Sequence, residues 1–505
     1  MRLLSVYLIF LFCLTAAPLG QADSRPNIVF IIADDLAWND LGCSGNPNVR
    51  TPHLDRLAKG GMQFTNAFLT ISSCSPSRAS IITGTYPHQT DAEQLHWPLP
   101  ADRLTFVELL KESGYWTAAA GKWHLGEAVK DRFDEVREAD VSGFQLPTGE
   151  AAKEGKIIQT VIGDARSGCD QWVPVLKARP KEKPFFLWLA ALDPHRDYDE
   201  GILEKPHKPE HVRLPPYVAD TPKSRHDYAL YYDEITRLDR FVGNVMAELK
   251  RQKVADNTLV LFISDNGRPF PRDKTTLYDS GIKTPFIAHW PGRIKPGSRS
   301  DSLVSSVDIG PAFLELAGLS TPTVFEGRSF LPLLRNPKLT LHDFVFAERN
   351  WHDYEDRVRA VRNKRFKYIR NFYDDLPNTP PADVVRSIAY REMIRLRDQG
   401  KLAAAQKNTF IQPRAKEELY DIKTDPFELR NLASDPKQAK RLNRFRRALA
   451  KWQKDTNDTE PEFRTPDEFG RENGQALPIR ERPRPDKVEM TNRLRKYYRD
   501  KAKRP

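Results

Sequence analysis

The sequence feature that most constrains the fold is a continuous apolar run, NIVFIIA, at Asn27–Ala33. Most of its residues are β-branched, and it shows no polar alternation, which is typical of a strand buried on both faces in a parallel sheet. Similar runs occur at 116–120, 185–192 and 259–263. Helical patterns separate them, including a long amphipathic one over 228–249. This alternation predicts an α/β fold with a large, mostly parallel sheet flanked by helices.

The chain changes character near residue 340. Residues 344–373 have the pattern of short antiparallel strands, and a charged helical stretch follows. Beyond 461 the chain is rich in Pro and Arg, has few apolar residues, and is expected to be an extended tail. We therefore predict a main domain over 23–339, a smaller C-terminal α+β domain on an antiparallel sheet over 340–460, and a basic tail over 461–505.

The N-terminus has the features of a signal peptide. Arg2 precedes an apolar run at 3–14, and small residues follow up to a plausible cleavage point after Ala22. The run is too short to span a bilayer comfortably, and no other segment is apolar enough. We expect cleavage of 1–22, no integral membrane segment afterwards, and a periplasmic or secreted protein.

Three cysteines remain after this cleavage: Cys43, Cys74 and Cys169. An odd number in an exported protein implies at least one unpaired thiol. The sequence leaves open whether Cys43 and Cys169 pair, because pairing depends on geometry.

The formal net charge is +11. A basic surface attracts nucleic acid, acidic membranes or sulfated glycans, although a merely solvated basic face is the commonest case. The export signal argues against nucleic acid as the partner.

Each of four predicted strands ends in a polar cluster: Asp34-Asp35, Gly121-Lys122-Trp123-His124, Asp193-Pro194-His195-Arg196 and Ser264-Asp265-Asn266-Gly267. Ligands of open α/β sheets bind beyond the carboxyl ends of the strands. If these strands are parallel neighbours, the clusters meet in one crevice. A single cluster of this kind is usually only a cap or a turn, so the coincidence of four is the informative point.

The acidic residues of these clusters are suited to a metal ion. Asp34, Asp35, Asp265 and Asn266 offer only hard oxygen ligands, which favour calcium or magnesium over zinc. The alternative for the acidic pair is a helix N-cap, but adjacent carboxylates repel unless a positive charge lies between them. We predict one calcium ion per chain.

The segment from Cys74 to Gly84, CSPSRASIITG, predicts a helix with a cysteine at its start. Ser75 is expected to be the N-cap and Pro76 the first helical residue, which would place Cys74 where the helix dipole favours negative charge. Arg78, one turn further on, can reach back to an anion. The alternative is a buried structural cysteine.

This segment resembles the signature of the sulfatases, in which Cys-x-Pro-Ser-Arg is read by a formylglycine-generating enzyme that converts the cysteine to formylglycine. The resemblance extends from 26 to about 456 and includes NIVFIIADD, GKWH, DPHR, SDNG and ELYDIKTDPFELRNLASDP. Within the family, SSCSPSRAS, DPHR, SDNGRPFP and LAKWQKDTND are most similar to the heparan N-sulfatase group. One departure is DSGIK at 279–283, where many sulfatases have Glu-Gly-Gly-x-Arg, and it leaves Lys274 as the expected sulfate contact.

The resemblance implies an alkaline-phosphatase-like fold, a sulfated saccharide substrate, and a role for each clustered residue. Formylglycine at Cys74 is the nucleophile, and it joins Asp34, Asp35, Asp265 and Asn266 around calcium. Charge on the transferred group would be stabilised by Arg78, Lys122 and Lys274. His195 would protonate the leaving group, and His124 would deprotonate the second hydroxyl of the hydrated aldehyde. Candidate substrate contacts are His96, Arg196, Glu348 and His352.

Other functions remain open at this stage. An O-sulfatase would act on another sulfated polysaccharide in place of N-sulfoglucosamine. A phosphatase or phosphonate hydrolase would share the fold, but a two-zinc site needs extra histidine ligands, and none stands beside Asp34 or Asp265. A glycan-binding protein with a dead site would lose catalytic groups, all of which are present.

Overall fold

The computed structural model describes residues 25–139, 163–461 and 464–477. The predicted signal peptide and most of the predicted tail lie outside these residues. Among the described helices, none combines the length and apolar character needed to cross a membrane.

An eight-stranded sheet forms the centre of the molecule, in the order β5-β4-β6-β1-β7-β8-β2-β9. Its strands are β1 (Asn27–Ala33), β2 (Met62–Phe64), β4 (Trp116–Gly121), β5 (Glu135–Glu138), β6 (Phe185–Ala190), β7 (Thr258–Ser264), β8 (Phe286–His289) and β9 (Ser298–Ser300). All neighbouring pairs are parallel except those of β8 with β7 and with β2. Strand β1 pairs with β6 on one side and β7 on the other, so all seven of its residues are buried. The prediction of a large, mostly parallel sheet is confirmed.

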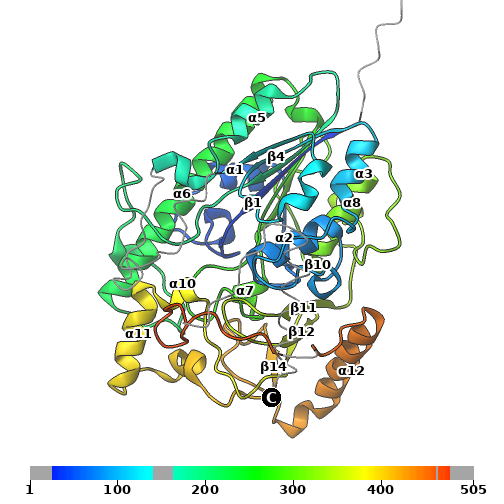
Figure 1. The fold of residues 1–505 in the computed structure, drawn as a ribbon. Coiled ribbons are helices and arrows are strands. Elements are labelled where there is room, and N and C mark those ends of the chain that lie inside the picture. The colour runs from blue at the N-terminus through cyan, green and yellow to red at the C-terminus, as the bar shows by residue number, and fades with distance from the viewer. Residues whose placement is uncertain (1–24, 140–162, 462–463, 478–505) are drawn as a thin grey trace, which may run out of the picture.

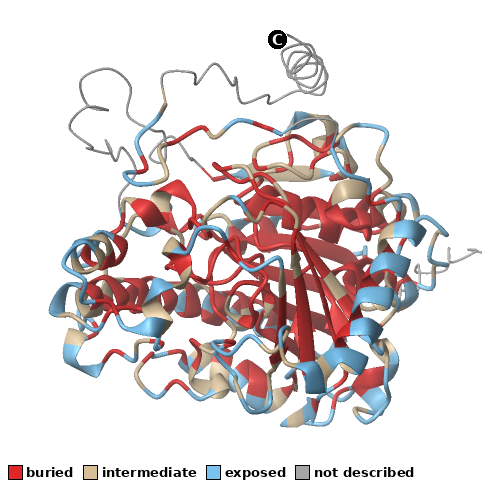
Figure 2. Ribbon diagram, turned by 90° about the horizontal axis from the view of Figure 1, so that it is seen from below, coloured by how far each residue is buried: buried red, intermediate tan, exposed pale blue. Residues whose placement is uncertain are grey.

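Helices cover both faces of this sheet (Figure 1). Alternate β1 side chains point to opposite faces, as the period of a strand requires. Ile28, Phe30 and Ile32 pack with α2 (Cys74–Thr83), α3 (Phe106–Glu112) and α8 (Ile309–Leu316). Val29, Ile31 and Ala33 pack with α1 (Pro52–Gly60), α5 (Trp172–Ala178) and α6 (Pro222–Arg251). The apolar side chains are concentrated in these layers, whereas the outer faces of the helices are exposed (Figure 2).

The predicted long amphipathic helix is α6. It begins after Thr221, whose hydroxyl accepts a hydrogen bond from the Ser224 amide at 3.2 Å, and Pro222 occupies the first turn. Both features are typical of helix N-termini, because they satisfy or remove donors that have no partner inside the helix. Shorter elements complete the main part of the chain: β3 (Ala67–Phe68), α7 (Asp279–Ile282), β10 (Val304–Ser305) and α9 (Leu331–Arg335).

A second, antiparallel sheet follows, as predicted. It consists of β11 (Val345–Arg349), β12 (Val358–Arg362), β13 (Phe366–Asn371) and β14 (Glu417–Asp421). Its helices are α10 (Ala382–Val385), α11 (Ile388–Asp398) and α12 (Ala439–Asp455), and α12 packs on one face of the sheet. On the other face, Val345, Val358 and Ile369 share an apolar cluster with Phe68 and Leu277 of the main part. The second sheet is thereby fixed against the main part through a common core.

Part of the predicted tail packs against α10 and the loop between β11 and β12. Phe469 is buried beside Tyr354 and Val384, and the Trp351 indole donates to the carbonyl of Pro466 at 3.0 Å. Polar contacts add to this aromatic anchor, including Arg471 Nη2 to the Glu355 carbonyl at 2.9 Å and Arg386 Nη1 to the Gly474 carbonyl at 2.7 Å. The low apolar content of the whole segment does not indicate this docking.

Candidate active site

The four polar clusters meet at one edge of the central sheet. Strands β4, β6, β1 and β7 are consecutive and parallel, so their carboxyl ends all lie at this edge. The arrangement follows from strand order, which places the two most acidic clusters, after β1 and β7, side by side.

Cys74 lies at the start of α2, above this edge. The N-cap is Ser73 rather than the expected Ser75, because Ser73 has extended backbone and its carbonyl accepts the first helical hydrogen bond from Ser77 at 2.9 Å. Ser75 instead uses its hydroxyl to accept from the His96 amide at 2.8 Å. Pro76 still falls in the first turn, where its missing N–H has no cost.

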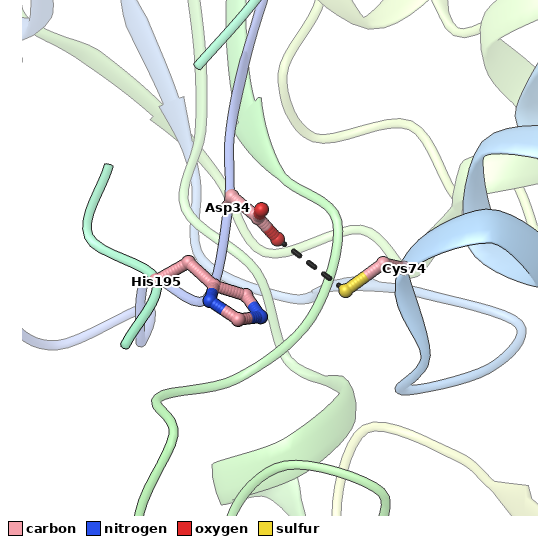
Figure 3. Close-up of side chains that lie close together, drawn as sticks. All are labelled: Asp34, Cys74 and His195. Carbon is pink, nitrogen blue, oxygen red and sulfur yellow. Dashed lines mark hydrogen bonds between the residues drawn. The ribbon is translucent and has the colours of Figure 1, made fainter. Parts of the chain in front are cut away.

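The Cys74 thiol faces the acidic cluster. Its Sγ is 3.4 Å from Asp34 Oδ1 and 3.4 Å from Asn266 Oδ1, and Figure 3 shows the thiol directed at the Asp34 carboxylate, with the His195 ring beside them. Ligand atoms of Asp34, Asp35, Cys74 and Asp265 all lie within 4.8 Å of one another, and all four residues are buried. The structure therefore brings the predicted nucleophile and metal ligands into one compact group.

Each of the three carboxylates contacts one cationic side chain. Lys122 contacts Asp34, and Lys274 Nζ is 2.8 Å from Asp35 Oδ2. Arg78 approaches Asp265 Oδ2 with Nε at 2.9 Å and Nη2 at 2.8 Å. Its Nη1 also donates to the Lys122 carbonyl at 2.9 Å, which links the start of α2 to the end of β4.

These cations compensate the buried carboxylates unequally. Burial would raise the pKa of Asp34, but Lys122, His195, Arg78 and Lys274 together hold it below its ordinary value. Burial and the charge of Asp34 raise the pKa of Asp35 to about 6, despite Lys274, and raise that of Asp265 to about 6, despite Arg78. Buried oxygen donors whose negative charge is incompletely balanced fit a hard divalent cation.

The Cys74 thiol is in an unfavourable place for a thiolate. Burial and the neighbouring Asp34 charge raise its pKa well above the ordinary value. In the unmodified chain Cys74 is therefore a neutral thiol rather than an activated sulfur nucleophile.

The histidines of the clusters form two groups. His195 Nε2 is 3.8 Å from both Asp35 Oδ2 and Asp383 Oδ2, while its Nδ1 contacts the Arg196 carbonyl. Burial and Lys274 lower the pKa of His195 to about 4. His124 pairs with His96, with their Nε2 and Nδ1 atoms 2.7 Å apart.

Asp383 is a site residue that the sequence did not reveal. It lies in α10, and its Oδ2 is 3.4 Å from Lys274 Nζ and 3.8 Å from His195 Nε2. No apolar strand precedes it, so the signal that identified the other acidic residues is absent here. It reaches the edge only because the second part of the chain docks there.

The expected substrate contacts divide into two groups. His352 is buried with Nδ1 2.7 Å from Ser73 Oγ, next to Cys74, and His96 bonds to Ser75. Arg196 and Glu348 are not brought into the group. Arg196 donates to both oxygens of Asp227, at 2.8 and 2.9 Å, and Glu348 accepts from the His88 amide at 2.8 Å and lies 2.5 Å from its Nδ1. Both are buried charges, and each is held by a structural partner.

Cys43 and Cys169 do not pair. Among the described residues, Cys43, Cys74 and Cys169 are all free thiols.

The fold and the site together define an alkaline-phosphatase-like hydrolase, in which a residue at a helix N-terminus faces an acidic cluster at the carboxyl edge of the sheet. The sulfatase family model matches residues 26–319, and the model described as N-sulphoglucosamine sulphohydrolase, C-terminal, matches 270–383. The chain belongs to the sulfatase family. It is therefore a hydrolase of sulfate esters or sulfamates, and sulfatases in general use a metal ion and a formylglycine.

Curated relatives cover most of the chain. Human N-sulphoglucosamine sulphohydrolase is 31% identical over 487 residues, which span 88% of this chain and 93% of that protein. An ulvan-active sulfatase of Formosa agariphila is 30% identical over 448 residues, spanning 86% of this chain and 81% of that protein.

Solved structures share the fold. One, in complex with its substrate D-glucosamine-2-N,6-O-disulfate, has a TM-score of 0.65 at 22% identity over 86% of this chain and 99% of that chain. The phosphonate monoester hydrolase of Agrobacterium radiobacter has a TM-score of 0.64 at 18% identity, over 86% and 96%. At these identities the likeness concerns the fold alone.

Proposed function

We propose that this protein removes sulfate from a sulfated saccharide, and that its first candidate substrate is N-sulfoglucosamine at the end of a heparan-type chain. The observation that carries the proposal is the placement of Cys74, within CSPSR, 3.4 Å from Asp34 and Asn266 in a buried acidic group. The similarity to human N-sulphoglucosamine sulphohydrolase along 88% of the chain supports the choice of sugar.

In this proposal Cys74 is converted to formylglycine by a formylglycine-generating enzyme. The hydrated aldehyde supplies one hydroxyl to attack sulfur and a second whose deprotonation expels the sulfate. The chain contributes the position of this group: the first turn of α2 directs backbone N–H groups and the positive end of the helix dipole at it. Arg78 adds a fixed positive charge one turn along the helix.

We propose that Asp34, Asp35, Asp265 and Asn266 hold one calcium ion, with magnesium as the alternative. A bound divalent cation would neutralise sulfate oxygens and favour the ionised nucleophile. Lys122 and Lys274 already lie against Asp34 and Asp35, so their ammonium groups are positioned to contact a sulfate held over the same carboxylates.

His195 is the proposed proton donor to the leaving group. Its Nδ1 is engaged by the Arg196 carbonyl, which turns Nε2 toward Asp35 and Asp383. An anionic neighbour favours the protonated imidazole, so an approaching sulfate ester or sulfamate promotes the form that donates. His124, oriented by His96, is the proposed base for the second hydroxyl, and His96 and His352 border the pocket.

The test is a panel of defined saccharides with free sulfate as the readout. N-sulfoglucosamine is offered beside 6-O-sulfated glucosamine, a 2-O-sulfated sugar that has a hydroxyl at carbon 2, and a phosphonate monoester. The proposal expects sulfate from N-sulfoglucosamine. Release from the O-sulfated sugars only would refute the N-sulfatase assignment while retaining a saccharide sulfatase.

An O-sulfatase acting on another sulfated polysaccharide is the second candidate. It is favoured by the similarity to ulvan-active sulfatases, at 30% identity over 86% of this chain. The same panel separates the two candidates, because its substrates differ in whether the sulfate group is attached to nitrogen or to oxygen. A pocket that binds one of these linkages is expected to discriminate against the other.

We also infer that the protein is exported and that 1–22 are removed. N-terminal sequencing of protein from the periplasm or culture medium tests this inference. A mature protein that retained residues 1–22 would contradict it.

A further inference from the structure

Helix α12 carries two stripes of side chains on opposite faces. Leu442, Phe445, Leu449 and Trp452 are buried against the second sheet, at intervals of three and four residues. The basic stripe consists of five exposed residues at the same kind of interval: Lys440, Arg444, Arg447, Lys451 and Lys454. Arg444 and Arg447 follow Leu442 and Phe445 by two residues, or about 200° around the helix, so the stripes are nearly opposed. Figure 1 shows α12 at the margin of the molecule.

The basic stripe is almost uncompensated. Asp455 is the one acidic residue of α12, and it pairs with Lys451 at 2.6 Å. Within the described residues, Lys440, Arg444, Arg447 and Lys454 have no carboxylate within ion-pair distance.

The other basic residues of α12 are engaged by the protein. Arg446 binds Glu417 at 2.5 Å, and the Arg441 guanidinium lies 3.8 Å from the Phe366 ring centroid. Within the stripe, Arg444 also contacts the fold, with its guanidinium 5.2 Å from the Phe344 ring centroid. Arg444 is nevertheless exposed, and its charge has no acidic partner among the described residues.

Such a stripe is unfavourable for a helix that serves only to cover the sheet. Like charges three or four residues apart repel, and surface helices normally intersperse Glu or Asp among their basic residues. The apolar face of α12 is fully used against the sheet, so the helix cannot also lie in a membrane interface. What remains is a row of cations about 20 Å long, at about 1.5 Å per residue, which exceeds what a single sulfate group could occupy.

The helix is linked to the active site indirectly, through His88 and the chain that follows β11. Its Trp452 ring lies 5.4 Å from that of His88, and the Thr456 carbonyl just beyond the helix lies 3.1 Å from His88 Nε2. His88 pairs with Glu348 of β11, and the chain after β11 supplies His352, which bonds to Ser73 beside the nucleophile. The basic stripe thus belongs to the part of the chain that also borders the pocket.

We propose that the basic stripe of α12 is an exosite that binds the anionic body of a sulfated polysaccharide while a sugar of the same chain occupies the active site. The polymer is a linear polyanion whose repeated charges match the repeated cations. The identity of that polymer rests on the proposed function, since it assumes that the substrate is a sulfated glycan.

The test compares two full-length variants with the same change in charge. The first carries Lys440→Glu, Arg444→Glu, Arg447→Glu and Lys454→Glu. The control carries Lys177→Glu, Lys181→Glu, Lys183→Glu and Lys250→Glu, at exposed positions around α5 and α6. Glu is a good helix former, and thermal melting verifies that both fold. If the first variant does not fold, Gln replaces Glu in both variants, which keeps their change in charge equal.

Binding to immobilised heparin and release of sulfate from a small saccharide are then measured. The exosite predicts that the α12 variant binds heparin at least about tenfold more weakly than the control at ~0.1 M salt, with a shallower salt dependence. Turnover of the small saccharide stays within about twofold of the unsubstituted protein, because α12 does not touch the reacting group.

Three results would overturn the exosite. The first is an equal loss of heparin binding in both variants, which would mean that only net charge matters. The second is unchanged binding by the α12 variant. The third is tighter binding of the unsubstituted protein to duplex DNA or to anionic lipid vesicles than to heparin. Failure to release sulfate from any small saccharide would instead refute the proposed function, and heparin binding needs no turnover, so the two failures are distinguishable.

Discussion

Two regions of this molecule bury carboxylates beside cationic side chains, with opposite results. In the second sheet, Arg359 donates to both oxygens of Asp458 at 2.7 Å each, and Arg414 donates to both oxygens of Asp356 at 3.0 and 2.7 Å. At the catalytic edge, formed by Asp34, Asp35 and Asp265, Arg78 reaches only Oδ2 of Asp265, and lysines approach Asp35 and Asp34 as point charges. The first arrangement pairs both oxygens of each carboxylate with an arginine. The second leaves Oδ1 of each carboxylate with only a neutral donor, from Cys74, Asn266 or the Asp35 amide.

The pKa values reflect this difference. Burial would raise the pKa of Asp458, but Arg359 and Arg357 bring it to about 2, and Arg414 and Arg349 likewise lower that of Asp356 against its burial. Burial raises the pKa of Asp35 and of Asp265 to about 6. A buried carboxylate closed by a bidentate arginine stabilises the fold, whereas a crowded group of partly balanced carboxylates is prepared for a cation.

Substitution of the proposed nucleophile should give the largest effect on turnover with the smallest effect on stability. Cys74→Ala is expected to lower turnover by roughly 10⁴-fold or more, because no other group at the edge can take over covalent chemistry. Thermal stability should change little, since the side chain is small. Sulfate release and thermal melting are the measurements, and peptide mass spectrometry of protein made with the modifying enzyme should show formylglycine at position 74. An active Cys74→Ala protein would contradict the mechanism.

Removal of one carboxylate from the catalytic edge comes next. Asp265→Asn preserves shape but removes the charge that Arg78 and the proposed calcium share, so bound calcium should be lost and turnover should fall by about 10³-fold. Elemental analysis and sulfate release check both effects. The matched control is Asp458→Asn, which should retain calcium. Full occupancy by zinc in the unsubstituted protein would disprove the calcium assignment.

The proposed acid can be tested through the leaving group. His195→Ala should slow hydrolysis of saccharide substrates by about 10²-fold or more, because a poor leaving group needs a proton. An activated aryl sulfate, whose leaving group is stable as an anion, should lose much less. Equal losses on both substrates would remove His195 from this role.

A substitution beside the second sheet should lower the stability of the protein and leave its turnover unchanged. Asp458→Asn leaves Arg359 buried without its full counter-charge and should lower the free energy of unfolding by about 3 kcal/mol. Denaturant unfolding measures the loss, and kcat on a small sulfated saccharide at a temperature where the variant is folded should be close to that of the unsubstituted protein. A large fall in kcat without a fall in stability would contradict the claim that Asp458 serves the fold and not catalysis.

The smallest expected effect is a dependence of stability on acid. The pKa of Asp458 in the folded protein, about 2, lies below its ordinary value of 3.8, so its contribution to stability is fully present above about pH 4. That contribution is lost as the pH falls toward 2. Between pH 5 and 2, the free energy of unfolding should therefore fall more steeply with decreasing pH for the unsubstituted protein than for Asp458→Asn. Parallel curves would show that Arg359 does not hold the carboxylate ionised.

Much of the site could be predicted because it follows strands. Asp34, Lys122, His195 and Asp265 come within three residues of the ends of apolar runs, and parallel strands place their carboxyl ends at one edge. The signature around Cys74 required no structure, since its residue types and spacing are local. The N-cap was misplaced by two residues, because Ser73 and Ser75 are both good caps and only the backbone distinguishes them.

Contacts between distant segments could not be predicted in the same way. Asp383 contacts Lys274, which lies 109 residues away in the chain, and Glu348 pairs with His88, which lies 260 residues away. Arg196 was a plausible substrate contact by position, but a bidentate partner, Asp227 on α6, holds it in the interior. Nothing in the local sequence of these residues indicates the partner.

The sequence by itself determined which strands are buried, which residues end them, and that a cysteine begins a helix, because these depend on hydrophobic period and on short-range spacing. The tertiary structure alone decided which charges are closed by arginine and which remain open at the catalytic edge. A buried charge is stable only with a partner, and that partner is supplied by whichever segment packs against it, however distant it lies in the chain.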